Sequence, residues 1–174
     1  MTQITRAVNE PILSFAAGSS ERASLQAKYD EMATQTIEIP LIIDGKEIKT
    51  GDMGNCVMPH NHQHVLATYH KAGETEVIQA IDVAMKSWKT WSTTTLEERT
   101  KIFRKAAELL QGPWRDTINA ATMLNQSKNA FQAEVDAACE LIDFLNFNAK
   151  YAEEITANHP LIPPDGMHNH LEYR

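Results

Sequence analysis

The sequence has few of the features that mark secreted, membrane-spanning or disulfide-stabilised proteins. Its 174 residues include only two cysteines, Cys56 and Cys139, which is too few for a disulfide framework. No apolar run approaches the roughly 20 residues needed to cross a bilayer. The N-terminus has neither the apolar core of a signal peptide nor the Arg-rich pattern of a transit peptide. These absences favour a reducing cytoplasm as the compartment.

A basic surface is also absent, because the formal net charge is -7. Nonspecific nucleic-acid binding needs clustered Lys and Arg, and so does adhesion to anionic membranes. We therefore expect neither a nucleic acid nor a membrane as a partner. The hydrophobic content of 43% and the charged content of 22% are those of an ordinary soluble globular protein with one real core.

Residue patterns divide the chain into three parts and predict an α+β fold, with a small antiparallel sheet and about four helices. Residues 1–36 are predicted to be an arm, in which Ser20 caps one short helix. Residues 37–155 hold short strands followed by helices. Residues 156–174 form a Pro- and His-rich tail without periodicity, in which a strand could begin at residue 171.

Alternating and apolar segments early in the second part predict the strands. Asp44 and Gly45 supply the positive φ values of a tight hairpin turn between two of them. The predicted strands are residues 37–39, 41–43, 46–49, 55–58 and 65–69.

A loop is predicted between the last two strands, and it carries three alternating histidines: His60, His62 and His64. In a strand these side chains would share one face and could bind a metal ion. Pro59 and Asn61 favour a loop instead, so we expect no metal site.

Helical periodicity begins after Gly73. In the first predicted helix Val77, Ile81, Ala84 and Trp88 fall on one stripe, which is typical of a face packed into a core. We therefore expect Trp88 to be a packing residue and not a ligand-stacking residue.

Two further helix starts carry capping boxes, which are paired side-chain and backbone hydrogen bonds at a helix N-terminus. Thr95 and Glu98 begin the second predicted helix, and Asn129 and Gln132 begin the fourth. The inward face of the second helix is predicted to comprise Leu96, Ile102 or Phe103, Ala106 and Leu110.

The last predicted helix has two unusual faces. Its core stripe comprises Val135, Ala138, Ile142, Leu145, Ala149 and Ala152. The opposite side holds Glu140 and other carboxylates, but also Phe144 and Phe147, whose exposure would forgo roughly 1.5–3 kcal/mol each. Either a second layer covers this side and Glu140 is a satisfied polar neighbour, or Glu140 faces an aromatic-lined pocket for a small molecule.

Residues 119–151 resemble the N-terminal third of the Δ1-pyrroline-5-carboxylate (glutamate γ-semialdehyde) dehydrogenases of the aldehyde dehydrogenase superfamily. The hairpin at residues 38–48, the segment 58–70 and the tripeptide at 111–113 are also similar to this family. The resemblance covers nearly the whole chain and departs visibly at residues 162–170. It implies that the chain is part of an α/β aldehyde dehydrogenase fold.

The resemblance implies oxidation of glutamate γ-semialdehyde to glutamate with NAD, in proline catabolism. In such enzymes a cysteine thiolate adds to the aldehyde, and the adduct gives its hydride to the nicotinamide. The family's nucleophile and nearly all of its nucleotide site lie beyond residue 174. We therefore expect no catalytic residue, metal ligand or cofactor-binding residue here, and NAD binding only in the complete enzyme.

One functional residue is carried over by the resemblance. Glu140 matches the family glutamate near the amino group of the substrate, where a carboxylate would pair with a desolvated ammonium. Cys56 and Cys139 lie in no matching motif, and we expect both to be inert small hydrophobic residues.

Three interpretations follow. The first is an N-terminal portion of such an enzyme, inactive alone because Arg174 falls where the family continues; its partners would be the missing C-terminal portion or a second copy. The second is a free-standing helical interaction or oligomerisation module, motivated by Phe144 and Phe147. The third is a split enzyme that a separate C-terminal chain completes.

Overall fold

The computed structural model describes residues 5–158, 164–167 and 169, and these form a mixed α+β structure, which confirms the predicted class. The strand start expected at residue 171 lies outside the described residues. The helices are α1 (Ser20–Ala33), α2 (Glu74–Trp91), α3 (Leu96–Gln111), α4 (Arg115–Gln126), α5 (Ala130–Ala133), the π-helix η1 (Glu134–Cys139) and α6 (Glu140–Ala157). The strands are β1 (Ile37–Ile39), β2 (Leu41–Ile43), β3 (Lys46–Ile48), β4 (Met53–Met58) and β5 (Asn61–His70).

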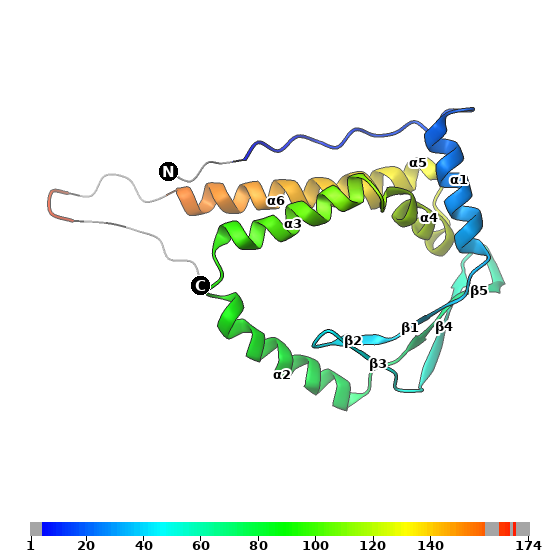
Figure 1. Cartoon of the computed structure of the whole chain (residues 1–174), viewed down its shortest axis with the longest axis horizontal. Coiled ribbons are helices and arrows are strands. Elements are labelled where there is room, and N and C mark those ends of the chain that lie inside the picture. Colours follow the sequence, from blue (N-terminus) through cyan, green and yellow to red (C-terminus); the bar gives the residue numbers. More distant parts are fainter. Residues whose placement is uncertain (1–4, 159–163, 168, 170–174) are drawn as a thin grey trace.

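The elements are arranged as an open ring, which Figure 1 shows. Helices α3 and α6 run side by side along one side of the ring, and the strands with α2 lie along the other. Helix α1 packs on α4 and leads into the strands. The segment before α1, residues 5–15, runs along the outer side of α6, and we call it the N-terminal arm.

The helix starts follow local side-chain chemistry closely. The predicted capping box of α3 is confirmed, because Glu98 N donates to Thr95 Oγ1 (3.2 Å) and Thr95 N donates to Glu98 Oε2 (3.2 Å). The cap of α1 is displaced by one residue from the prediction. Ser19, and not Ser20, accepts a hydrogen bond from Arg22 N (3.3 Å), since its backbone is extended whereas Ser20 is already helical.

The strands form two small sheets, one with the order β1-β5-β4 and one made of β2 and β3. The β2–β3 hairpin turns at Asp44 and Gly45, both with positive φ, as predicted. One pairing differs from the expected antiparallel arrangement, because β1 lies parallel to β5. Strand alternation carries no information on which distant strand becomes the neighbour, so this pairing was not predictable from pattern.

The predicted loop at residues 59–64 is wrong, because β5 begins at Asn61 and only Pro59 and His60 form the turn. Asn61 pairs with Met58 on β4, and shifts in register next to Val57 accommodate the tight return. Pro59 falls in the turn, where its missing N–H costs no ladder hydrogen bond.

The core is small and consists of two clusters. In the first, Phe15 and Leu25 pack on Ala120, which joins the N-terminal arm and α1 to α4. In the second, Ala107 of α3 packs against Ala138 and Ile142 of the last helix. The helical side of the ring is therefore held together by its own buried residues.

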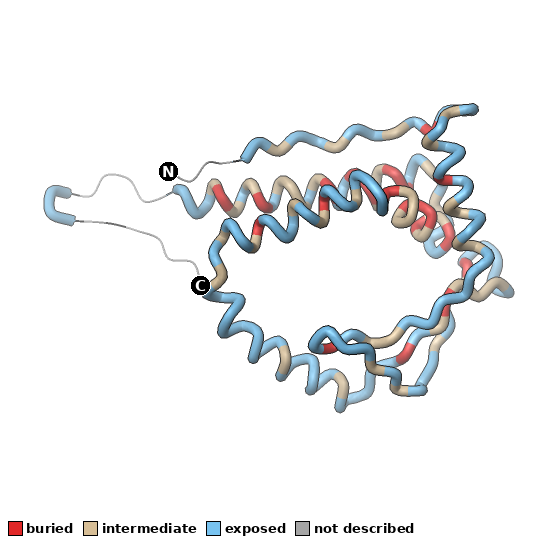
Figure 2. Tube along the Cα trace, in the orientation of Figure 1, coloured by how far each residue is buried: buried red, intermediate tan, exposed pale blue. Residues whose placement is uncertain are grey.

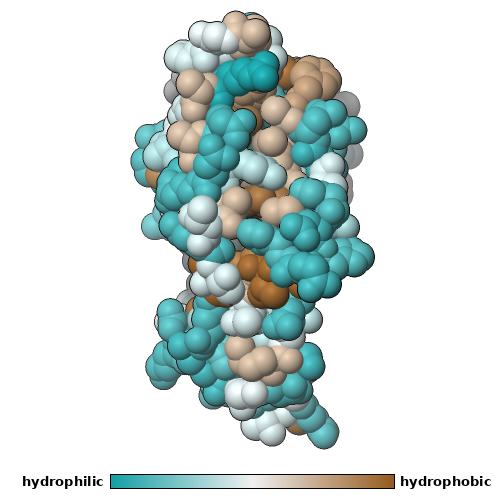
Figure 3. Space-filling view, turned by 90° about the vertical axis from the view of Figure 1, so that its right-hand side faces the viewer, coloured by the Kyte–Doolittle hydropathy of each residue, from teal (hydrophilic) through white to brown (hydrophobic). Residues whose placement is uncertain are grey.

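Helix α2 has no buried residue, so the prediction of a core stripe there is wrong. Val77, Ile81 and Trp88 are 50%, 56% and 60% exposed, and Figure 2 shows α2 almost entirely as exposed surface. The stripe exists, but its residues remain largely exposed in the described part of the chain. Figure 3 shows the molecule from the right-hand side of Figure 1, where hydrophobic residues form small areas between hydrophilic ones. No helix in the described residues is long and apolar enough to cross a membrane.

Helix α3 also differs in detail from the predicted inward face. Ile102 and Phe103 are 57% and 46% exposed, whereas Thr100 and Ala107 are buried against α6. The partner helix approaches one side of the broad apolar face and leaves the other side open. Phe103 then lines an apolar groove together with Trp91 and Phe144.

Candidate functional site on the last helix

The last helix is built from α5, η1 and α6 without interruption, and its core face is confirmed. Ala138 and Ile142 are fully buried and Ala149 is 4% exposed. The predicted Asn129–Gln132 capping box starts the helix, with Gln132 N donating to Asn129 Oδ1 (2.9 Å). The core face fixes the rotation of the helix, and with it the direction of the opposite side.

The opposite side carries an open groove of about 390 Å³. Phe144 on this side is 60% exposed, and Glu140 is also exposed. The N-terminal arm covers part of the same side and contributes Asn9 to the groove. The lining residues are Asn9, Glu140, Asp143, Phe144, Phe147, Asn148 and Tyr151.

The Glu140 carboxylate makes no hydrogen bond or ion pair with any residue that the structure describes, so it is available to a ligand in the groove. The aromatic wall beside it includes Phe147 and Tyr151, whose ring centroids lie 6.0 Å apart. Tyr151 already takes one ammonium on its ring, since Lys150 Nζ lies 5.0 Å from the centroid. A carboxylate next to aromatic faces is suited to binding a small cation.

Neither cysteine has the surroundings of a nucleophile. Cys139 is buried, and burial together with the neighbouring Glu134 carboxylate raises the pKa of its thiol to about 11. Cys56 is half-buried, and its Sγ lies 2.9 Å from Asn125 Oδ1. A thiol with a raised pKa is almost entirely protonated at neutral pH and does not attack an aldehyde.

A buried ion pair next to the groove was not anticipated. Arg115 of α4 donates to Glu134 of η1 and, at 2.5 Å, to Glu10 of the arm. Burial alone would raise the pKa of the Glu134 carboxyl, but hydrogen bonds from Arg115, Leu13 N and Asn119 outweigh burial and hold that pKa below its ordinary value. The two ion pairs of Arg115 join three segments of the chain: the arm, α4 and the last helix.

The sequence contains a signal for the Arg115–Glu134 ion pair, because two glutamates continue the core stripe of the last helix. Glu134 precedes Ala138 by four residues and Glu153 follows Ala149 by four, so both glutamates extend the buried stripe of the last helix. A carboxylate on a core stripe predicts a buried partner. Arg115 partners Glu134, and Arg104 partners Glu153 at 2.6 Å.

The histidine-rich segment does not form a metal-binding group. His60 Nδ1 lies 2.7 Å from Ser127 Oγ. Within residues 5–158, 164–167 and 169, no three His, Cys, Asp or Glu side chains come together in a way that could hold a metal ion.

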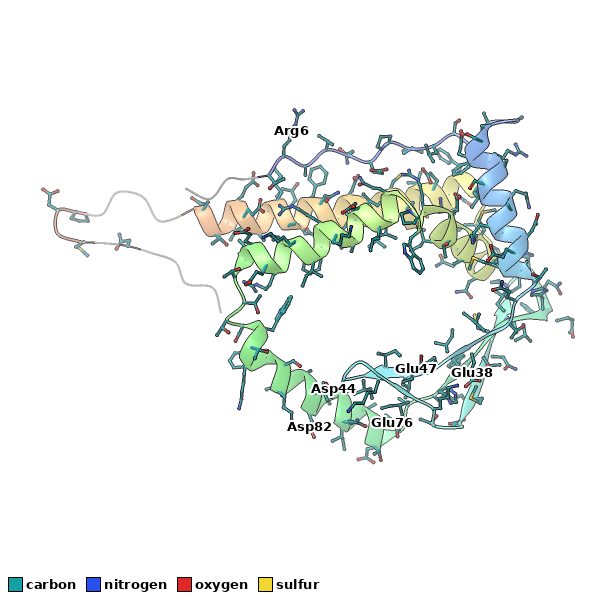
Figure 4. The ribbon with its side chains drawn as sticks, viewed as in Figure 1. Arg6, Glu38, Asp44, Glu47, Glu76 and Asp82 are labelled. Carbon is teal, nitrogen blue, oxygen red and sulfur yellow. The ribbon has the colours of Figure 1, made fainter. Side chains whose placement is uncertain are left out.

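A second polar cluster ties the strands together. His70 is buried, and its Nδ1 accepts a hydrogen bond from Gly51 N (3.1 Å), so its Nε2 donates to Glu38 (3.0 Å). Lys49 also lies 2.8 Å from Glu38. Hydrogen bonds from His70 and Lys49 lower the pKa of Glu38 to about 2. Figure 4 places Glu38 on the strands, far from the last helix, so this cluster belongs to the sheet.

Comparison with known proteins identifies the class. The sequence model of the aldehyde dehydrogenase family matches residues 48–173, so this chain belongs to the aldehyde dehydrogenase family. Within that family it is homologous, over part of their length, to Δ1-pyrroline-5-carboxylate dehydrogenases.

The relatives are similar along almost all of this chain. The Δ1-pyrroline-5-carboxylate dehydrogenase of Agaricus bisporus is 44% identical over 167 residues, which is 95% of this chain and 31% of that protein. The crystal structure of the Mycobacterium tuberculosis enzyme matches with a TM-score of 0.90 at 39% identity, over 94% of this chain and 31% of the other. Structures of that enzyme with NAD are also known. The chain therefore spans about 30% of the length of these relatives.

Proposed function

We propose that this chain is part of an NAD-dependent dehydrogenase that oxidises glutamate γ-semialdehyde to glutamate in proline catabolism, and that Glu140 binds the ammonium of the substrate. The observation that carries the proposal is the groove in which the Glu140 carboxylate stands free beside Phe144 and Phe147. A substrate ammonium that leaves water needs a counter-charge, and Glu140 supplies it. The proposed reaction follows from the relatives, which are named as Δ1-pyrroline-5-carboxylate dehydrogenases.

The described residues do not fit a dinucleotide. Helix N-termini favour a bound phosphate, and carboxylates in the first turn repel it. The first turn of α2 carries Glu74 and Glu76, and that of α3 carries Glu97 and Glu98. No glycine-rich turn joins a strand to a helix in the sequence. We derive no hydride-transfer step from this chain and propose that NAD binding requires the rest of the enzyme.

The test compares two ligands that differ in a single charged group. L-Glutamate and glutarate share both carboxylates, and only glutamate has the ammonium. In NMR titrations we expect glutamate to shift the signals of groove residues such as Phe147 at lower concentration than glutarate. Glu140→Gln should remove this preference while leaving the fold intact. Equal responses to the two ligands in the unaltered chain would falsify the assignment of Glu140.

Activity assays test the second part of the proposal. The chain alone, given glutamate semialdehyde and NAD, is expected to produce no NADH, because neither cysteine has the surroundings of a nucleophile. Measurable turnover by the purified chain would contradict the proposal that activity requires further protein.

A free-standing interaction or oligomerisation module is the second candidate, and the exposed stripe of α2 favours it. Val77, Ile81 and Trp88 remain at least half exposed, which is a large apolar face for an isolated chain. We propose that the remainder of such an enzyme or a second copy covers it. Light scattering at increasing concentration tests self-association, and a monomer at all concentrations would leave the remainder of the enzyme as the partner.

The cytoplasm remains our proposed location, supported by two free cysteines, Cys56 and Cys139. Several relatives, including those of rat and human, are named as mitochondrial. A fluorescent fusion of this chain in its own cells tests the proposal, and an organellar signal would overturn it.

A further inference from the structure

The N-terminal arm is held on the last helix by its backbone. Three backbone N–H groups of the arm each donate to a carboxylate on the helix, so the docking does not depend on the arm's side chains at these points. The bonds join Thr5 N to Glu153 Oε2 (3.0 Å), Glu10 N to Asp143 Oδ1 (2.7 Å) and Leu13 N to Glu134 Oε1 (2.9 Å).

For the bonds of Thr5 and Glu10, the spacing of donors and acceptors matches an extended chain lying antiparallel to a helix. Thr5 and Glu10 are five residues apart, and five extended residues span about 16 Å. Their acceptors, Glu153 and Asp143, are ten residues apart, and ten helical residues rise about 15 Å. The match lets both bonds form without bending the arm.

The middle contact differs from the two outer ones. Glu134 and Glu153 are each also bound by an arginine of a neighbouring helix. The hydrogen bonds of the Asp143 side chain within the described residues are only to the arm, because Asn9 Nδ2 donates to its Oδ2 (2.7 Å) and Glu10 N donates to its Oδ1. Among these three carboxylates, Asp143 is therefore the one whose hydrogen bonds within the described residues hold only the arm.

Asp143 also stands beside Glu140, since residues three apart on a helix are neighbours on its surface. Both side chains line the same groove, and so does Asn9. We propose that Asp143 is a positioning residue that holds the N-terminal arm on the last helix, and we call its two hydrogen bonds to Asn9 and Glu10 the latch. The latch thereby places Asn9 as the second polar wall of the Glu140 groove. The ligand of this groove rests on the function proposed above, whereas the latch does not.

The latch determines which atoms the groove offers. A carboxylate only accepts hydrogen bonds, so the Asn9 amide must turn its NH₂ group to Asp143 and its carbonyl oxygen away. Each Asp143 oxygen then already accepts one hydrogen bond from the arm. An ammonium has three donors and would find the Glu140 carboxylate and the Asn9 carbonyl as acceptors.

The latch is tested by trypsin, because Arg6 lies on the arm and points away from α6 in Figure 4. Cleavage after Arg6 requires the docked arm to open locally. Asp143→Ala removes two charge-assisted hydrogen bonds, so we expect cleavage there to be at least about tenfold faster. Asp136→Ala is the matched control, because Asp136 binds Lys128 and not the arm. Rates at sites within the helices must stay unchanged, which separates release of the arm from general unfolding.

The groove is tested by repeating the glutamate titration with Asn9→Ala and Asp143→Ala. We expect each variant to bind glutamate about fivefold more weakly, with glutarate unaffected, because about one charge-assisted hydrogen bond is lost. Equal cleavage after Arg6 in Asp143→Ala and Asp136→Ala would overturn the latch. If Glu140→Gln abolishes the preference for glutamate while both arm variants bind normally, the role of Asn9 is wrong and the proposed function stands. If the unaltered chain shows no preference, the proposed function and the role of Asn9 both fall, and the trypsin result alone decides the latch.

Discussion

Helices α2 and α6 have the same kind of sequence pattern and opposite environments. Each has apolar residues at helical spacing, and the same core packing was predicted for both. Ile142 of α6 is fully buried, whereas Ile81 of α2 is 56% exposed. The pattern defines which face of a helix is apolar, and it does not define whether the same chain supplies the surface that covers it.

The difference comes from the neighbours of each helix. Helix α6 packs on α3, and the N-terminal arm lies along another side of it. Helix α2 touches the described residues mainly at β2, and its stripe remains open. If the remaining two thirds of an enzyme like its relatives cover this stripe, as we propose, α2 and α6 are equivalent parts of a larger core.

The largest expected effect is on the helical side of the ring. Arg115→Ala would leave the fully buried Glu134 without its cation, and the free energy of unfolding should fall by about 3–5 kcal/mol. Urea denaturation followed by circular dichroism measures it. Lys128→Ala breaks the exposed Lys128–Asp136 pair and should cost at most about 1 kcal/mol. Similar losses in both variants would mean that burial does not distinguish the two ion pairs.

The second effect tests the buried stripe of α6. Ile142→Ala removes a fully buried side chain and leaves a cavity against Ala107, so we expect a loss of about 2–5 kcal/mol in the free energy of unfolding. The measurement is again urea denaturation. A loss below about 1 kcal/mol would show that α3 and α6 do not pack tightly in solution.

The third effect concerns the sheet side and depends on pH. The pKa of Glu38 is about 2 in the folded chain against an ordinary 4.5. A lowered folded pKa stabilises the fold fully above the ordinary pKa, and the contribution is lost as the pH falls from about 4.5 towards 2. The stability difference between the unaltered chain and Glu38→Gln should therefore be constant near neutral pH and shrink over this window.

The control for the pH prediction is Glu47→Gln on the neighbouring strand β3, which Figure 4 also labels. The Glu47 carboxylate, on a strand that pairs with β2, accepts no hydrogen bond from the described residues. Urea midpoints measured at several pH values give both curves. The same pH dependence in both variants would contradict a specific role of the His70–Glu38 contact.

The smallest effect is expected on α2. Ile81→Ala should change the free energy of unfolding by no more than about 0.5 kcal/mol, because its side chain is already largely in water. Urea denaturation of this variant next to Ile142→Ala compares the two helices directly. A loss of several kcal/mol at Ile81 would mean that α2 is covered in solution, for example by a second copy of the chain.

Local features were predictable because their chemistry acts over a few residues. The capping boxes at Thr95 and Asn129 and the hairpin turn at Asp44 were all anticipated. The parallel pairing of β1 with β5 was not, since it joins residues about 30 positions apart along the chain. The extension of β5 back to Asn61 was missed because cross-strand pairing with Met58 outweighed the local loop preference.

The candidate site likewise has a part that was predictable from local sequence and a part that depends on residues far apart along the chain. The sequence placed Glu140 opposite the core stripe, with Phe144 and Phe147 beside it, and the structure gathers these side chains around one groove. Asn9 and Asp143 were not linked by any sequence pattern, because 134 residues separate them. The arm's other hydrogen bonds to carboxylates of the helix come from backbone N–H groups, which leave no trace in the side-chain sequence.

The sequence by itself therefore determined the helices, two capping boxes, the apolar faces and the family to which the chain is similar. Only the tertiary structure decided which faces are covered, how the arm docks and which atoms meet at Glu140. The physical reason is the range of the interactions. Capping and periodicity depend on neighbours within about one helical turn, whereas burial of a face depends on a partner surface. Helix α6 has that surface within the described residues, and α2 does not.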